Sequence, residues 1–165
     1  MPATRAVVRV RQATPDDLGM VVELRLALVT EHRSSIIYGR TRHDMLARAR
    51  KLFLSQLRSP REITLLADRA GQVVGILRCV DTAGHPLLYP DRYGYISSVF
   101  VRPEARRQGV LRALLLSAER WCRERGLDEL RLHNAADNPL SNASWEALGF
   151  GIAEHLRIRR LPAEE

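Results

Sequence analysis

The sequence predicts an α+β fold built on one mixed sheet. Several short apolar or alternating segments in the first two thirds of the chain are typical of strands, and two of them are joined as a hairpin. A strongly amphipathic helix over 109–125 then follows the strand 93–101 and leads to another strand. A hairpin meander followed by a crossover through a helix is typical of a mixed sheet with packed helices.

Each early element has a local signal. Alternating apolar and basic residues predict a strand over 7–11. Thr14 and Pro15 suit the cap and first turn of a helix that runs to about residue 32, and residues 42–57 place apolar side chains on one face of a second helix. Two strands, 63–67 and 73–80, form a hairpin with a longer loop over 68–72.

Turn residues divide the second half of the chain in the same way. Gly84, Pro86 and Pro90 make 81–92 a loop, and Gly126 and Gly149 end two helices. The remaining predicted elements are the strand 93–101, the helix 109–125, the strand 127–134, the helix 139–148 and a last strand 155–161.

Bulk composition predicts an ordinary globular domain. The 165 residues are 45% hydrophobic and 27% charged, which fits one domain over 1–165. Cys79 and Cys122 are too few for a disulfide framework and are expected to be buried thiols. Residues 1–5 lead into no signal peptide, and no run is long enough to span a membrane. We therefore expect a cytoplasmic protein that binds no membrane.

The net charge of +7 comes almost entirely from arginine, since Lys51 is the one lysine among 26 basic residues. Codon usage in a G+C-rich genome explains this bias, and recognition of an anion by planar guanidinium groups explains it as well. A nucleic-acid surface is disfavoured, because 19 acidic residues are interspersed with the basic ones and no aromatic residues interleave with them on a strand.

The most informative segment lies between the strand 93–101 and the helix 109–125. A polar, arginine-rich turn ends at Gly109, and the helix begins directly after it. The N–H groups of a first helical turn and the helix dipole favour a phosphate, and glycine allows the main chain to approach a ligand closely. The turn is therefore a candidate seat for a phosphate or pyrophosphate. The alternative is a solvated turn before a core helix.

Two segments together resemble the Gcn5-related N-acetyltransferase (GNAT) superfamily. Residues 101–110, Val-Arg-Pro-Glu-Ala-Arg-Arg-Gln-Gly-Val, are similar to its acetyl-CoA signature, a strand followed by Arg/Gln-x-x-Gly-x-Gly/Ala and a helix. Asn138, followed by Trp-Glu-Ala-Leu-Gly-Phe over 145–150, is similar to its second signature. The resemblance covers nearly the whole chain in element order and implies a mostly antiparallel central sheet flanked by helices on both faces.

The resemblance implies acetyl-CoA as co-substrate and no metal. The main chain of 99–101 is expected to pair with the pantetheine arm as an added strand, and the pyrophosphate is expected at the turn. Asn138 has an alternative role as a helix cap, because a proline follows it. The implied cofactor-binding residues are Val99, Phe100, Val101, Arg106, Arg107, Gln108, Gly109, Val110, Leu111, Arg112, Asn138 and Trp145.

Three positions depart from the family pattern. Leu111 stands where Gly or Ala is usual, and we expect its side chain to point inward. Trp145 stands at the position of the usual acid, tyrosine; an indole is no practical acid, so we expect this ring in the core. No glutamate stands on the strand 93–101 as a base. Tyr93 and Tyr95 are the candidate phenols there.

His133 aligns with a second position at which relatives carry the base. Histidine titrates near neutral pH and suits proton abstraction from an amine, directly or through water. The alternative is a strand histidine that is hydrogen-bonded to a neighbour and has no catalytic role.

In this fold the first two helices and the loop between them usually shape the acceptor pocket. His32, Arg33 and Tyr38 are the candidate acceptor residues there, with Glu31 and Arg42 beside them. Arginines near the acceptor suit a small acidic amine better than a polycationic aminoglycoside or polyamine. A simply solvated loop is the alternative.

The favoured function is direct acetyl transfer from acetyl-CoA to a primary amine. A non-catalytic acyl-CoA-binding or sensor module is the alternative from another class, because both usual catalytic residues are replaced. The expected partners are acetyl-CoA and the amine, with no nucleic acid, and a homodimer is compatible with the fold.

Overall fold

The computed structural model describes residues 7–163, so the expectation about residues 1–5 lies outside the described residues. The chain forms two compact units, Met1–His133 and Asn134–Glu165, which are described separately. Within the described residues, no helix is both long and apolar enough to cross a bilayer.

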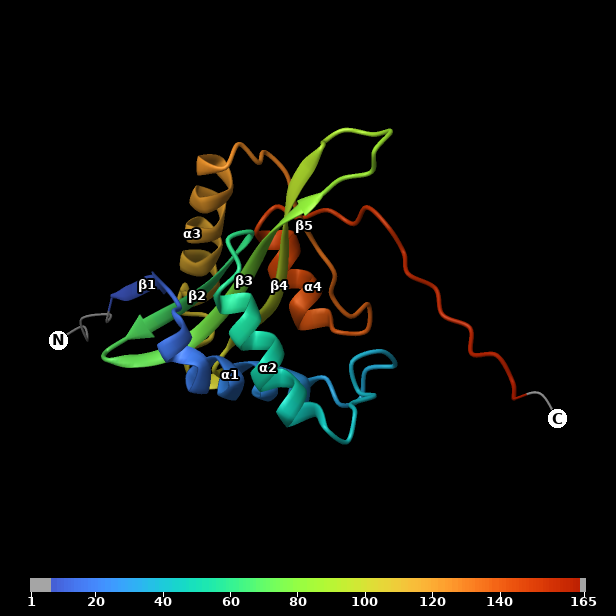
Figure 1. The fold of residues 1–165 in the computed structure, drawn as a ribbon, viewed down its shortest axis with the longest axis horizontal. Helices are drawn as coiled ribbons and strands as arrows, with labels where there is room; N and C mark the ends of the chain where they lie inside the picture. Colours follow the sequence, from blue (N-terminus) through green and yellow to red (C-terminus); the bar gives the residue numbers. More distant parts are fainter. Residues whose placement is uncertain (1–6, 164–165) are drawn as a thin grey trace. The chain divides into compact units, whose positions relative to one another are not determined.

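A five-stranded mixed sheet forms the centre of the first unit (Figure 1). Its order is β1-β2-β3-β4-β5, so neighbouring strands in the chain are neighbours in the sheet. The first four strands run antiparallel and β5 runs parallel to β4, which confirms the predicted mostly antiparallel mixed sheet. The strands are β1 (Val8–Gln12), β2 (Glu62–Arg69), β3 (Gln72–Ala83), β4 (Arg92–Val101) and β5 (Leu130–Leu132).

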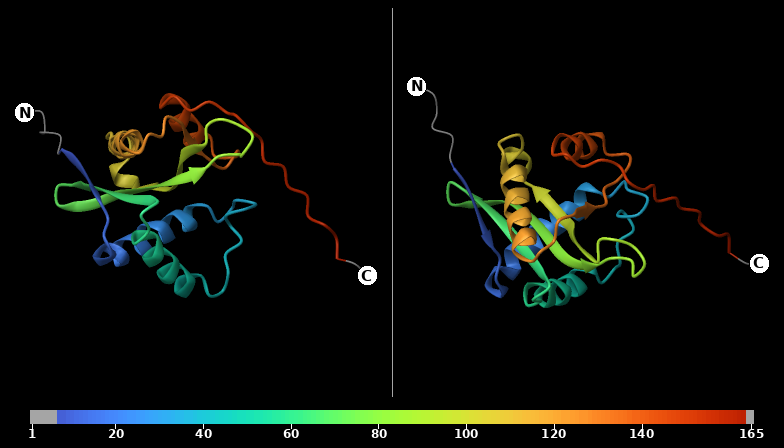
Figure 2. Two further views of the ribbon diagram at one scale, coloured as in Figure 1. Left: turned by 45° about the horizontal axis from the view of Figure 1, so that its top comes forward. Right: turned by 90° about the horizontal axis from the view of Figure 1, so that it is seen from above.

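Helices cover both faces of this sheet, as predicted (Figure 2). A short 3₁₀ turn, η1 (Pro15–Asp17), leads into α1 (Leu18–Glu31), which lies with α2 (Met45–Leu57) on one face. The α3 helix (Val110–Glu124) covers the other face. The predicted starts and ends of these helices differ from the observed ones by at most a few residues, because caps and glycines mark them locally.

Each face buries its own apolar core. On the first face, Leu24 of α1 and Phe53 of α2 pack with Leu66, Ile76 and Phe100 of the sheet. Burial of such side chains supplies about 1.5–3 kcal/mol each. On the second face, α3 buries one apolar stripe, which begins at the first residue of the helix. The stripe consists of Val110, Leu114, Leu115, Ala118 and Cys122.

The two thiols meet under α3. Cys79 and Cys122 are free and buried, as predicted, with 3.6 Å between their sulfur atoms. Gly94 of β4 lies against them, and an added Cβ there would be only 2.6 Å from the sulfur of Cys122. This glycine is therefore required by the close approach of α3 to the sheet.

The β2–β3 hairpin corrects one prediction. Arg69 pairs with Gln72, so only Ala70 and Gly71 form the turn, and both have positive φ angles, 50° and 80°. Two consecutive left-handed residues make the type I′ turn that matches the twist of a hairpin. The longer loop predicted over 68–72 is wrong, because an alanine in this conformation gives no clear sequence signal.

The second unit contains α4 (Pro139–Ala147). Its cap is Asn138, whose side-chain oxygen accepts a hydrogen bond from the N–H of Ser141 at 3.0 Å. Trp145 is buried and packs edge-on against Phe150, with 5.3 Å between the ring centroids. The predicted strand over 155–161 is wrong: residues 150–163 are irregular and largely exposed, and alternation alone forms no strand without a paired edge.

Candidate active site

The turn between β4 and α3 presents main-chain N–H groups. After the short 3₁₀ turn η2 (Pro103–Ala105), Arg107 and Gly109 adopt left-handed φ angles of 58° and 83°. The first hydrogen bond of α3 runs from the N–H of Ala113 to the carbonyl of Gly109, at 3.0 Å. The N–H groups of 110–112 precede that bond and have no acceptor four residues back in the helix. Such N–H groups at a helix start suit an anion, so the geometry is compatible with the predicted phosphate seat, which stays a prediction.

Gly109 is needed for conformation rather than for space. An added Cβ would meet no atom within 4 Å, whereas a φ of 83° strains any residue with a side chain. From the sequence, we expect a glycine here because the main chain approaches a ligand closely. The left-handed backbone is a second and independent reason for a glycine at this position.

Two arginines of the turn are held by the protein itself. Arg102 donates to the carbonyl of Val73 at 2.9 Å and pairs with Glu23 of α1 at 2.5 Å. Arg106 donates to the carbonyl of Val101 at 2.9 Å and pairs with Glu31 of α1. These guanidinium groups anchor the turn to α1. The predicted anion seat is therefore left with its main-chain N–H groups as the donors that these contacts do not use, and a role of Arg106 as a direct cofactor ligand stays a prediction.

The edge of β4 that leads to this turn has a stretch that β5 does not cover. The last β4–β5 pair is Ile96 with Leu132, although β4 continues to Val101. A bulge interrupts β4 here, since Arg78 pairs with Ser97 but Ile76 pairs with Phe100, and Ser98 has a φ of 52°. Main-chain groups over 99–101 thus fit an extended arm that adds itself as a strand, as the sequence predicts.

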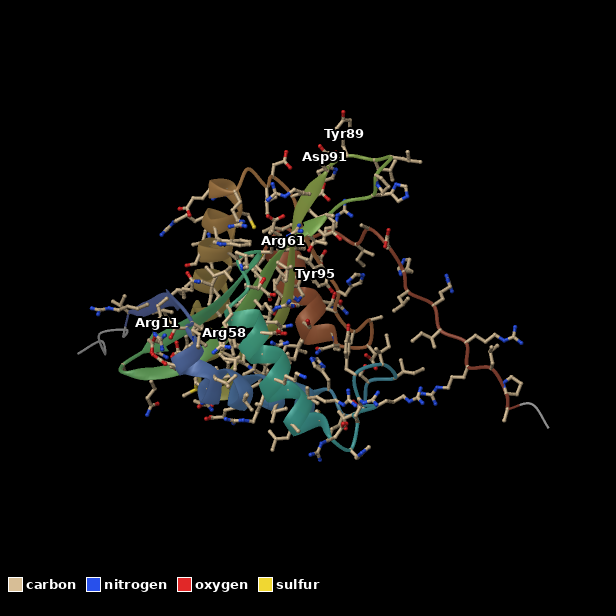
Figure 3. All side chains as sticks on the ribbon, viewed as in Figure 1. Arg11, Arg58, Arg61, Tyr89, Asp91 and Tyr95 are labelled. Atoms are coloured by element: carbon tan, nitrogen blue, oxygen red, sulfur yellow. The ribbon has the colours of Figure 1, made fainter. Side chains whose placement is uncertain are left out.

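Two of the three predicted catalytic residues meet. Tyr95 lies on β4 (Figure 3). Its hydroxyl is 2.8 Å from Nδ1 of His133, which follows β5 in the chain. Partial burial raises the pKa of Tyr95, and the neighbouring phenols of Tyr38 and Tyr93 raise it further. Tyr95 therefore stays protonated at neutral pH. Tyr93 lies on the same face of β4, but its ring packs under the guanidinium of Arg131, 4.1 Å away.

The loop between α1 and α2 lies near this pair. Tyr38 is close enough to Tyr95 to affect its pKa, and its ring centroid lies 5.8 Å from that of His32. The N–H of Tyr38 donates to the Ser35 hydroxyl at 3.1 Å, which orders the loop. Arg33 is an exposed residue of the same loop. Of the three predicted acceptor residues, His32 and Tyr38 are thus in contact, and the role of all three stays a prediction.

Sequence reasoning missed a polar group on the α1–α2 face of the sheet. Arg78 of β3 pairs with Glu62 of β2 and donates to the Ser97 hydroxyl of β4 at 3.0 Å. Arg25 of α1 stacks 3.6 Å above the ring of Phe53. Two features of the sequence could have indicated this group: polar residues at alternating positions of the strands, and one arginine on the apolar face of the first helix.

Arg25 differs from the anchored arginines of the turn. It donates to the side-chain oxygen of Gln56 at 2.6 Å, a neutral partner. Burial, followed by the charge of Arg78, lowers the pKa of Arg25 to about 9. The cation is thus held in a place that disfavours its charge.

Leu111 gives a test of the turn. The side chain is half-buried beside the apolar stripe of α3, in partial agreement with the expected inward orientation. We expect Leu111→Gly to lower the free energy of unfolding by about 2 kcal/mol without tightening acetyl-CoA binding, because packing and helix propensity are lost. Denaturant unfolding and calorimetry measure both quantities. Exposed Leu116 of the same helix is the control, since Leu116→Gly loses propensity alone; much tighter acetyl-CoA binding by Leu111→Gly would contradict the expectation.

Comparison with known proteins places the chain in a family. The acetyltransferase (GNAT) family matches residues 26–150, and the chain belongs to that family. The family and the fold agree with the predicted resemblance.

Relatives and solved structures add detail. An aminoglycoside N(6′)-acetyltransferase type 1 of Klebsiella aerogenes is 35% identical over 74 residues, 45% of this chain and 49% of that protein. The chain thus aligns with about half the length of that relative. A predicted acetyltransferase from Clostridium acetobutylicum, solved with acetyl-CoA, has a TM-score of 0.76 at 18% identity and covers 93% of this chain and 96% of its own. The aminoglycoside N-acetyltransferase AAC(6′)-Iy, solved with CoA, has a TM-score of 0.76 at 19% identity, with 99% and 100% covered.

Proposed function

We propose that the protein is an acetyl-CoA-dependent N-acetyltransferase that transfers the acetyl group directly to a primary amine. The observation that carries the proposal is the hydrogen bond between Tyr95 and His133, 2.8 Å long, on the strand that leads to the anion seat. Solved structures of the same fold that hold acetyl-CoA or CoA support the choice of co-substrate. The paired catalytic groups favour an enzyme over a non-catalytic sensor.

Acetyl-CoA supplies the acetyl group as a thioester. In our proposal the N–H groups of 110–112 bind its pyrophosphate, and the edge of β4 over 99–101 pairs with the pantetheine arm. The thioester would then lie beside the bulge of β4 at Ser98, three residues from Tyr95. Asn138 and Trp145 stay predicted cofactor contacts.

His133 and Tyr95 each carry one of the two proton transfers that the reaction needs. With Nδ1–H of His133 donating to the oxygen of Tyr95, Nε2 is free to take a proton from the attacking amine. The amine nitrogen forms a bond to the thioester carbonyl carbon, and the carbon–sulfur bond breaks. The departing thiolate takes the phenolic proton of Tyr95, and Nδ1–H of His133 returns a proton to the phenolate.

Replacement of His133 tests the base. We expect His133→Ala to lower kcat/KM about 100-fold at neutral pH and to remove the acidic limb of the pH–rate profile, because our proposal assigns the proton transfer from the amine to this side chain. Steady-state acetylation followed by thiol release measures both. His155→Ala, in the exposed C-terminal segment, is the matched control. An unchanged rate with an unchanged acidic limb would exclude His133 from the mechanism.

For the acceptor we favour a small amine that carries an acidic group. Arg33 and Arg42 in the loop after α1 suit a carboxylate or phosphate. Relatives that match part of the chain are named aminoglycoside N(6′)-acetyltransferases, so a screen must include aminoglycosides. Turnover of polycations alone would contradict the acidic acceptor and leave the acetyltransferase proposal standing.

A further inference from the structure

Arg25 is a half-buried cation whose hydrogen bond goes to a neutral group. Its guanidinium lies on the face of Phe53, 3.6 Å from the ring centroid, and Val21, Val22 and Leu24 of the same helix are buried in the core. Among the described residues, no carboxylate lies within ion-pair distance of it. A sequestered charge without a counter-ion costs stability, so its presence calls for an explanation in function.

The surroundings of Arg25 add positive charge. Arg78 is close enough to lower the pKa of Arg25, while Glu62 opposes that effect less strongly. Because Glu62 is already paired with Arg78, the group of three carries one uncompensated positive charge. The remaining donors of Arg25 form a planar fork suited to a carboxylate.

Three carboxylates in or next to α1 and α2, the helices on this face of the sheet, already form ion pairs with arginines. Glu23 and Glu31 of α1 pair with Arg102 and Arg106, and Asp44, at the start of α2, pairs with Arg48 at 2.6 Å. A polycationic acceptor would therefore share each of these carboxylates with an arginine, whereas an anionic acceptor would not. Among the described residues, Oδ1 of Asp44 is the buried side-chain oxygen that has no hydrogen-bond partner.

We propose that Arg25, supported by Arg78, binds a carboxylate of the acceptor and so selects amines that carry one. The inference rests on the proposed acetyltransferase function and names the subsite that fixes its substrate class. Ser97, which holds Arg78, lies two residues along β4 from Tyr95 on the same face of the sheet. Two residues along a strand span about 7 Å, so Arg78 is anchored to β4 close to the residue that we place at the thioester, and the series of amines below measures the spacing between amine and carboxylate.

Matched amines test the selection. We would compare the ω-amino acids from glycine to 5-aminopentanoate with alkylamines of equal length and with the aminoglycoside neamine. We expect at least one ω-amino acid to exceed its alkylamine in kcat/KM by about 10- to 100-fold, the value of one charge-assisted pair. Arg25→Met should abolish this preference by lowering kcat/KM for the ω-amino acid to the value for its alkylamine, whereas Arg120→Met should leave the preference and the alkylamine rate unchanged. Equal or better turnover of alkylamines or neamine by the natural protein would overturn the proposal.

Binding without turnover separates this inference from the proposed function. Calorimetry with glutarate as the probe, in the presence of CoA, should show binding to the natural protein and loss of at least tenfold in Arg25→Met. Glutarate binding that is unaffected by the substitution, or absent from the natural protein, would overturn the subsite. If glutarate binds through Arg25 while no amine is acetylated, the subsite stands and the proposed transfer fails.

Three variants guard against effects on folding. Arg25→Met keeps the apolar contact with Phe53 and removes an unpaired cation, so its midpoint of thermal unfolding should equal or exceed that of the natural protein. Arg25→Lys keeps the charge without the fork and should retain part of the carboxylate preference. Arg120→Met, on the exposed side of α3, should leave both the preference and glutarate binding unchanged. A marked loss of stability in Arg25→Met with an unchanged preference would assign Arg25 a structural role instead.

Discussion

Tyr95→Phe is expected to lower kcat by about 100-fold or more while the Kd for acetyl-CoA stays within a factor of two. The substitution keeps the ring and removes only the hydroxyl, which lies 2.8 Å from His133. Proton transfer by a positioned side chain contributes about 10²- to 10⁴-fold, and the hydroxyl is the group that we place at the departing thiolate. Stopped-flow release of thiol and equilibrium binding separate the two effects.

Two other tyrosines make this a comparison between matched substitutions. Tyr93→Phe removes a phenol from the same face of the same strand, where the ring packs against Arg131 rather than His133. Tyr89→Phe removes one from the exposed end of the β3–β4 hairpin and should leave kcat unchanged (Figure 3). A larger loss in Tyr93→Phe than in Tyr95→Phe would assign the acid to Tyr93.

The raised pKa of Tyr95 also shapes the expected pH dependence. Burial is the main cause, and it disfavours the phenolate. An acid with a pKa above its usual value of about 10 stays protonated through the neutral and mildly alkaline range. We therefore expect no loss of kcat from ionisation of Tyr95 below about pH 10, and the alkaline limb, where present, should disappear in Tyr95→Phe.

The elements that the sequence predicts well are those that local chemistry specifies. Gly109, with its left-handed φ, and the apolar stripe after it fix the turn and α3 without reference to the rest of the chain. Asn138 and Pro139 mark the start of α4 in the same way. Because the proposed anion seat consists of main-chain groups at one helix end, the sequence predicts where those groups lie once it predicts the helix start.

The missed features depend on how distant strands align. Arg78, Ser97 and Glu62 meet because a bulge near Ser98 sets the register of β4 against β3, and no local pattern shows that register. Arg25 lies on the apolar face of its helix, so periodicity alone gives it the role of a core position. The hydrogen bond between Tyr95 and His133 likewise needs β5 beside β4, although both residues were individually predictable.

The same turn shows how fold and site are connected. Arg102 and Arg106 tie the turn to Glu23 and Glu31 of α1, and the role of Arg106 as a cofactor ligand stays a prediction. The helix that carries Arg25 is therefore anchored to the segment that presents the anion seat. In our proposal, one set of ion pairs thus holds the acceptor side and the cofactor side of the site in a fixed relation within the first unit.

The largest loss of stability is expected from Asp81, which lies far along β3 from that turn. Its side chain is 3% exposed, and it accepts hydrogen bonds from Arg92 at 2.8 Å and Arg125 at 3.4 Å. It thereby joins β3 to the start of β4 and to the end of α3. We expect Asp81→Asn to lower the free energy of unfolding by about 3 kcal/mol, the low end for a broken buried pair, because both arginines retain access to water.

The pH dependence gives this prediction its sign. The hydrogen bond from Arg92 is the main reason that the pKa of Asp81 is lowered in the folded protein. Near these pKa values the folded state binds fewer protons at Asp81 than the unfolded state does. The contribution of Asp81 to the free energy of unfolding is therefore complete above the unfolded pKa of about 3.9, and it declines as the pH falls toward the lower pKa of the folded state. Urea unfolding should show the full difference between the natural protein and Asp81→Asn at pH 7 and a smaller one at pH 3. Asp91→Asn, an exposed carboxylate on the β3–β4 hairpin, should show almost no difference at either pH; equal losses in the two variants would mean that net charge, and not the buried pair, is responsible.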